Sequence, residues 1–171
     1  MIQKSLKNIT NEKAIIASWW DYGYELRYQT GIAVVTDGGN PANIKNVYLA
    51  RALISTNSAF TADEIRFASY FDTQTLSDYF PRRPTLDRAV GVEKDIYLFL
   101  PSDLQDKMIT VFNIAATTFN QSALTNYNSD ESAFSILYHK RPQVWGPFVL
   151  VAAEKDGAVL YRLPAPNMPK R

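Results

Sequence analysis

The chain has 171 residues, of which 46% are hydrophobic and 20% are charged, and its formal net charge at pH 7 is +1. This length suits one globular domain with a core, and so small a net charge argues against nucleic acid or an anionic membrane surface as a partner. The absence of cysteine excludes disulfides and thiolate metal sites. No apolar run approaches the roughly 18 residues typical of a membrane span, and no secretory signal pattern follows Met1.

The first third of the chain alternates short apolar runs with turn-forming residues. Residues 2–10 have near-helical apolar spacing and predict a short amphipathic helix. Residues 14–17 and 32–35 predict buried strands, and the second strand is followed by turn formers at residues 37–41. Ligand sites favour the carboxyl ends of strands, so the residues directly after the first strand are candidates for a binding site.

The middle of the chain predicts helices on either side of one strand. Residues 43–55 and 61–79 have helical apolar spacing, and the second helix opens with a capping box in which Thr61 bonds the backbone N–H of Glu64. Residues 81–94 predict a loop and residues 95–100 a strand. Pro101 then predicts the start of a helix. Its apolar stripe contains Leu104, Met108, Val111, Phe112 and Ala115.

The last third predicts strands. Residues 116–130 predict a surface connection, and residues 134–138, 147–152 and 158–163 predict three strands, the last two joined by a hairpin turn at 154–157. We therefore expect residues 1–171 to form a single compact domain of the mixed α/β (α+β) class. Helices would pack with a small mixed sheet, and a β-hairpin would lie near the carboxyl terminus.

The sequence offers no residues for complete catalytic or metal chemistry. His139, the only histidine, has no cysteine or second histidine with which to complete a zinc site or a nucleophilic triad. The carboxylates are scattered, without a pair that spacing would assign to acid and base roles. We predict no catalytic residue and no metal ligand within this chain, and a self-sufficient hydrolase or transferase has almost no support.

One stretch, Trp19-Trp20-Asp21-Tyr22-Gly23, does suggest a binding function. Adjacent tryptophans are a poor solution to ordinary packing, because neighbours on a strand or a helix point in different directions. A Ser or Thr hydroxyl has one donor and two acceptor lone pairs, each indole supplies one donor, and an ionised Asp supplies only acceptors. Together these side chains can satisfy a hydroxyl if the backbone is tightly turned, and the conformational freedom of glycine suits such a turn.

These five residues are identical to the signature pentapeptide of the catalytic subunit of oligosaccharyltransferases, the membrane enzymes that N-glycosylate Asn-x-Ser/Thr sequons. The resemblance extends over most of the chain, although only the pentapeptide is highly specific. Residues 24–28 with 36–39 resemble the Tyr-rich segment and Asp-Gly-Gly turn of the bacterial single-subunit enzymes. Residues 95–101 resemble the strand before their second sequon-contacting helix, and residues 148–151 through 160–163 resemble their closing strands.

The resemblance implies roles for five residues. Trp19 and Trp20 would donate to the sequon hydroxyl, and Asp21 would accept from it. Met108 and Val111 align with a Met-x-x-Ile pattern whose Ile touches the methyl of a sequon threonine, although Val here replaces Ile. Burying one methyl at roughly 0.8 kcal/mol predicts a several-fold preference for Thr over Ser.

Two further features depart from the family pattern around this helix. Ala115 stands where a larger aliphatic residue is usual, and a few extra residues separate Pro101 from Met108. Plain core packing is therefore the competing interpretation of Met108 and Val111.

The resemblance also implies what lies outside this chain. A membrane portion before Met1 would hold the lipid-linked oligosaccharide and a Mn²⁺ or Mg²⁺ cofactor with its carboxylates, so the present chain would need no cofactor and would be inactive alone. Its partners would be a peptide or protein with an Asn-x-Ser/Thr sequon and its own transmembrane domain. It would lie on the extracytoplasmic, periplasmic face of the inner membrane.

The alternative is a stand-alone structural or peptide-binding domain. There the Trp19 and Trp20 rings would pack ordinarily and Asp21 would cap a turn. Burial separates the two hypotheses. A binding module directs the indole N–H groups and the carboxylate into an open cleft, whereas a structural module satisfies each of them inside the protein.

Overall fold

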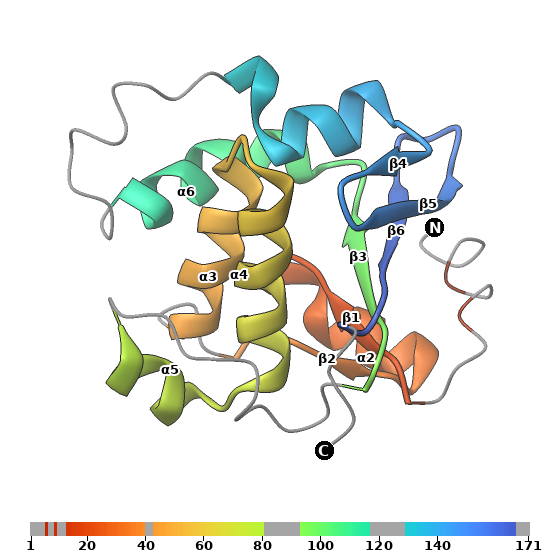
Figure 1. Cartoon of the computed structure of the whole chain (residues 1–171). Helices are drawn as coiled ribbons and strands as arrows, with labels where there is room; N and C mark the ends of the chain where they lie inside the picture. The colour runs from red at the N-terminus through yellow and green to blue at the C-terminus, as the bar shows by residue number, and fades with distance from the viewer. Residues whose placement is uncertain are drawn as a thin grey trace.

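The computed structural model describes residues 6, 9, 13–39, 43–80, 93–116 and 129–166, which form an α+β fold built on a six-stranded mixed sheet (Figure 1). The strand order is β2-β1-β3-β6-β5-β4. The first three strands in this order are parallel to one another, and each later strand is antiparallel to its neighbour. Both the expected fold class and the carboxyl-terminal hairpin are confirmed. The strands are β1 (Ile15–Ala17), β2 (Ala33–Val34), β3 (Ile96–Leu100), β4 (Val144–Trp145), β5 (Phe148–Ala153) and β6 (Val159–Leu163).

Most of the helices lie on one side of the sheet, and the short helix α2 lies apart from them (Figure 1). In Figure 1, α3 and α4 stand side by side to the left of the strands, α6 crosses above α3, and α2 lies at the lower right. None of the helices in the described residues combines the length and apolar character needed to cross a bilayer. The helices are α2 (Gly23–Thr30), α3 (Ile44–Ile54), α4 (Ser58–Tyr70), α5 (Thr73–Tyr79), α6 (Leu104–Ala116), two 3₁₀ turns, η1 (Trp20–Tyr22) and η3 (Ser129–Glu131), and a π-helix, η4 (Ser135–Lys140).

The order of the parallel strands decides where the chain can open a crevice. From β1 the chain moves outward through α2 to β2, and from β2 it returns past β1 through α3, α4 and α5 to β3. Right-handed crossovers running in opposite directions place their helices on opposite faces of the sheet. The segments that leave β1 and β3 therefore diverge, and a crevice at such a switch point is where open α/β sheets bind ligands.

Two expected elements differ in the structure. The helix expected over residues 61–79 begins at Ser58, because the Asn57 side chain accepts from the N–H groups of Ala59 and Phe60, and the Thr61 hydroxyl instead donates to two carbonyls, including that of Ala52. It also ends at Tyr70, and α5 starts anew behind the Asp72 cap. The predicted capping box at residues 61–64 is therefore wrong.

The strand expected at residues 134–138 is also wrong, since the chain is helical there. Phe134, Leu137 and Tyr138 are buried, whereas the two residues between them are half-buried, so burial follows helical spacing. Phe134 stacks on Tyr138 with ring centroids 4.9 Å apart. Such i, i+3 and i+4 contacts exist only in a helix.

Three further predictions concern residues that the structure mostly does not describe. The helix at residues 2–10 lies almost wholly there, although Leu6 and Ile9 are buried. Most of the loop at 81–94 and of the connection at 116–130 lies there as well.

A buried ion pair joins α3 to α4 within the helical layer. The Arg51 Nε lies 3.1 Å from the Glu64 Oε2, and the Glu64 side chain is fully buried. The Arg51 guanidinium also lies 5.5–5.8 Å from the ring centroids of Tyr48, Phe60 and Phe80. The glutamate that the sequence suggested for a helix cap thus neutralises an arginine held among aromatic rings.

Removing one partner of this pair should be costly. We expect Glu64→Ala to lower the free energy of unfolding by about 3–5 kcal/mol, because it removes the carboxylate that faces the buried Arg51 guanidinium. Asp63→Ala breaks a longer, partly exposed pair with Arg66 (3.7 Å) and should cost less than about 1 kcal/mol. Urea unfolding measures both, and a loss at Glu64 no larger than that at Asp63 would contradict the analysis. The double variant Arg51→Met/Glu64→Met should recover most of the loss.

Candidate functional site at the carboxyl ends of β1 and β3

The Trp-Trp-Asp stretch forms a tight turn at the carboxyl end of β1, as expected. Trp19 still has extended dihedrals (φ −62°, ψ 142°), and the Tyr22 N–H donates to the Trp19 carbonyl at 3.1 Å. Residues Trp20–Tyr22 make one 3₁₀ turn that continues directly into α2. The sequence did not predict α2, because Leu26 is its only buried large side chain and no apolar stripe marks it.

Gly23 is required here by close approach and not, as expected, by an unusual backbone conformation. Its dihedrals are helical (φ −58°, ψ −45°). A Cβ at this position would lie 2.0 Å from the Thr36 carbonyl oxygen and 2.6 Å from the Asp37 Cα. The first turn of α2 therefore rests directly on the backbone that follows β2.

The three polar side chains of the turn have different environments. Trp19 is only 2% exposed and lines a small apolar void with residues of α3, α4 and β3, so it packs as a core residue. Trp20 is half-buried, and its indole Nε1 is buried without a hydrogen-bond partner among the described residues. Asp21 reaches solvent, with its side chain 25% exposed.

Residues at the start of α6 contact this turn. The Lys107 Nζ lies 2.5 Å from the Asp21 Oδ2 and 4.5 Å from the Tyr22 ring centroid. The hydroxyl of Tyr22 donates to the Oδ1 of Asp103, the residue before α6, at 2.5 Å. Burial and the Asp103 carboxylate raise the pKa of Tyr22, so its phenol remains a protonated donor. These polar contacts join the turn to the start of α6.

Tyr22, Asp103 and Lys107 were not predicted as site residues. Asp103 and Lys107 are four residues apart at the amino end of a helix, which alone indicates only a local pair, here 3.9 Å apart. The usable signal was their position after a strand that lies parallel to β1, because the carboxyl ends of neighbouring parallel strands meet at one edge.

The structure places Met108 and Val111 differently from each other. Val111 is fully buried in the core, whereas Met108 is half-buried at its margin. Ile109, which no motif singled out, is 76% exposed. Of the two residues assigned to the sequon methyl, only Met108 has accessible surface in this structure.

Metal sites in proteins cluster His, Asp or Glu side chains around the ion. No group of three or more such side chains within the described part of the chain is arranged to hold a metal ion. His139 is exposed at the end of η4 and packs edge-on against Tyr138, with ring centroids 5.0 Å apart.

The close approach at Gly23 leads to a stability prediction. We expect Gly23→Ala to destabilise the fold by about 3 kcal/mol or more, because the new methyl must push apart two backbone segments. Gly31→Ala is the matched control: at φ +70° it is strained, but a Cβ there meets nothing within 4 Å, so about 1 kcal/mol is expected. The midpoint of urea unfolding, compared at an unchanged dependence of the free energy on urea concentration, measures both effects. Equal losses of unfolding free energy at the two glycines would contradict the prediction.

Known proteins resemble this chain in sequence. Residues 12–86 match the family model described as the STT3/PglB/AglB core domain. An undecaprenyl-diphosphooligosaccharide–protein glycotransferase of Campylobacter jejuni strain RM1221 is 37% identical over 138 residues, which cover 66% of this chain and 19% of that protein. The counterpart from C. jejuni serotype O:2 is 35% identical over the same length. The chain thus spans about a fifth of the length of these relatives.

Solved structures share the fold. The C. jejuni PglB C-terminal domain superposes with a TM-score of 0.64 at 16% identity, covering 93% of this chain and 96% of that domain. The C-terminal globular domain of an Archaeoglobus fulgidus oligosaccharyltransferase superposes with a TM-score of 0.54 at 13% identity, covering 95% and 93%. The family model, the relatives and the shared fold together support the assignment of this chain as an oligosaccharyltransferase C-terminal globular domain.

Proposed function

We propose that this chain is the acceptor-recognition domain of an oligosaccharyltransferase and binds the Ser or Thr hydroxyl of an Asn-x-Ser/Thr sequon at the Trp-Trp-Asp turn. The observation that carries the proposal is the Trp20 indole, whose buried N–H lacks a partner among the described residues. An unsatisfied buried donor costs about 1–3 kcal/mol, so its retention beside an exposed carboxylate calls for a ligand.

A hydroxyl matches the groups available at the turn. The Trp20 N–H would donate to the hydroxyl oxygen, and the hydroxyl would donate to the Asp21 carboxylate. Of the two Asp21 carboxylate oxygens, Lys107 binds Oδ2, which leaves Oδ1 as an acceptor. Trp19 is proposed as a second donor from its core position.

Lys107 acts in this proposal as a positioning residue. Its ammonium beside Asp21 fixes the direction of that carboxylate, and the Tyr22 ring holds the ammonium by a cation–π contact. The Thr methyl would meet Met108 first, because Val111 becomes accessible only if α6 shifts.

The rest of the proposal rests on the names of the relatives. By name, the two C. jejuni proteins transfer an oligosaccharide from undecaprenyl diphosphate to protein. We infer the same glycosyl transfer for the whole protein, with the lipid-linked oligosaccharide, Mn²⁺ or Mg²⁺ and the chemistry in a transmembrane domain at the periplasmic face. By holding the sequon, the present chain would orient the asparagine amide, which accelerates a reaction between two bound groups.

The structural alternative has one observation in its favour, the burial of Trp19 against the helical layer. It does not account for the unpartnered Trp20 donor.

Two substitutions in the full-length protein test the binding role. Asp21→Ala removes the acceptor, and Trp20→Phe keeps most of the ring while removing the N–H. We expect each to lower kcat/KM for a sequon peptide about fivefold or more, equivalent to about 1 kcal/mol of lost transition-state stabilisation.

Asp106→Ala, an exposed carboxylate in the first turn of α6, is the control and should change kcat/KM less than about twofold. If Asp21→Ala or Trp20→Phe stays within that same margin, the assigned role is wrong. The isolated 171-residue chain should transfer no glycan. Glycan transfer by the isolated chain would contradict the proposal that the chemistry takes place in a transmembrane domain.

A further inference from the structure

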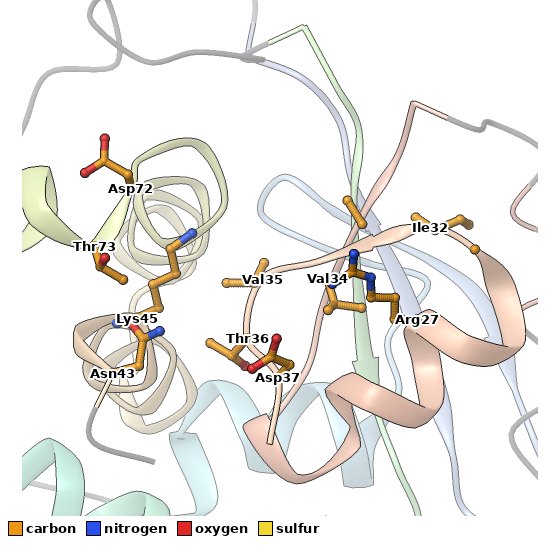
Figure 2. A pocket seen from close by; sticks show the side chains of 12 residues that line it. Arg27, Ile32, Val34, Val35, Thr36, Asp37, Asn43, Lys45, Asp72 and Thr73 are labelled. Atoms are coloured by element: carbon orange, nitrogen blue, oxygen red, sulfur yellow. Dashed lines mark hydrogen bonds between the residues drawn. The ribbon is translucent and has the colours of Figure 1, made fainter. Parts of the chain in front are cut away.

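A second polar pocket lies away from the Trp-Trp-Asp turn, along the open edge of the sheet. Its volume is about 600 Å³, and residues 31–37, which include β2, form one continuous wall. The opposite wall comes from the amino ends of α3 and α5, including Asn43, Lys45 and Asp72, and Arg27 of α2 closes the side (Figure 2).

The wall formed by β2 presents backbone groups that no other described strand pairs with. Among the residues that the structure describes, β2 pairs with β1 on one side only, in a register that sets Ile16 opposite Val34, and the Val35 N–H donates to the Ile16 carbonyl. Hydrogen-bonding direction alternates along a strand, so Ala33 and Val35 face β1 while the N–H and C=O of Val34 face the open edge. An unpaired strand edge is a template for a further strand.

The charged side chains of the pocket are unequally engaged. The Asp72 carboxylate caps α5 through the Thr75 N–H and hydroxyl, and the Asp37 Oδ1 accepts from the Gly39 N–H. Lys45 and Arg27 have no ion pair or side-chain hydrogen bond within the described ranges, and Figure 2 shows them reaching into the pocket from different walls. Two cations are thus available for an anionic group.

Lys45 in particular lacks compensation. It is half-buried, and burial lowers its pKa while the nearby Asp72 charge only partly offsets that effect. A desolvated ammonium without a direct partner binds a carboxylate more strongly than an exposed lysine does.

We propose that this pocket binds an extended polypeptide segment that adds as a strand to the open edge of β2 and places an acidic side chain beside Lys45. The backbone edge selects a peptide over a free anion, and the Lys45 ammonium selects an acidic residue within it. The site is distinct from the proposed sequon site, because it uses the opposite side of β2 from β1 and no residue of the Trp-Trp-Asp turn.

The test uses the 171-residue chain and acetylated, amidated Gln-Val-Glu-Val-Gln, which lacks the hydroxyl that the Trp-Trp-Asp turn would bind. Amide shifts measured by NMR give the dissociation constant and the location. We expect shifts at residues 31–37 and 45, and roughly tenfold weaker binding of Gln-Val-Gln-Val-Gln. A peptide N-methylated at all five residues should bind at least about tenfold more weakly, since neither of its edges can donate a backbone hydrogen bond to a strand.

Variants locate the two contributions. Lys45→Met should abolish the preference for Glu over Gln, whereas Lys155→Met, in the exposed hairpin turn, should preserve it. Val34→Pro removes the outward N–H, together with a side chain that packs against the core, and should weaken both peptides. The N-methylated peptide tests the same contact if that variant does not fold.

Equal binding of the Glu and Gln peptides, shifts outside the pocket, or equal binding of the N-methylated peptide would each overturn the proposal. So would the same shifts from sodium acetate at the peptide's concentration. Loss of sequon binding without loss of this peptide would leave it standing.

Discussion

A backbone contact at Gly23 determines where the rest of the site lies. The first turn of α2 rests on the Thr36 carbonyl so closely that no side chain fits between them. Because η1 and α2 are continuous, this contact also fixes the positions of Trp20 and Asp21 at the end of β1. The position of the turn is thereby fixed relative to both β1 and β2, and a proposed binding site needs rigid support of this kind.

The start of α6 is joined to the turn by contacts weaker than those of the core. α6 buries Leu104, Val111 and Ala115 and packs against α3, whereas its polar contacts to the turn among the described residues are the partly exposed Lys107–Asp21 and Tyr22–Asp103 pairs. A partly exposed ion pair contributes about 1 kcal/mol, so separating it costs far less than disturbing the core. On the proposed function, a sequon would replace these polar contacts while the Gly23 contact stays intact.

The sequence predicted those parts of the fold that local pattern determines. Residues 14–17, 95–100 and 158–163 are apolar runs bounded by turn formers, and each is a strand. Residues 134–138 fit a strand equally well by composition, and only packing of Phe134 on Tyr138 reveals the helix. In the site, the turn was predictable from its own residues, but Lys107 was not, since its link to Asp21 spans 86 positions. Tertiary contacts of that kind leave no local signature.

The shortness of β2 connects the two proposed binding regions. A two-residue strand has little stability of its own, and β2 is maintained by pairing with β1 on one side and by contacts with α2. Thr36 and Asp37, which directly follow it, are the residues on which Gly23 rests. A strand added at the open edge would supply the missing second partner of β2 and so steady the segment beneath the Trp-Trp-Asp turn. On these proposals, ordering at the edge and ordering at the turn favour each other, because each reduces the conformational entropy that the other must remove.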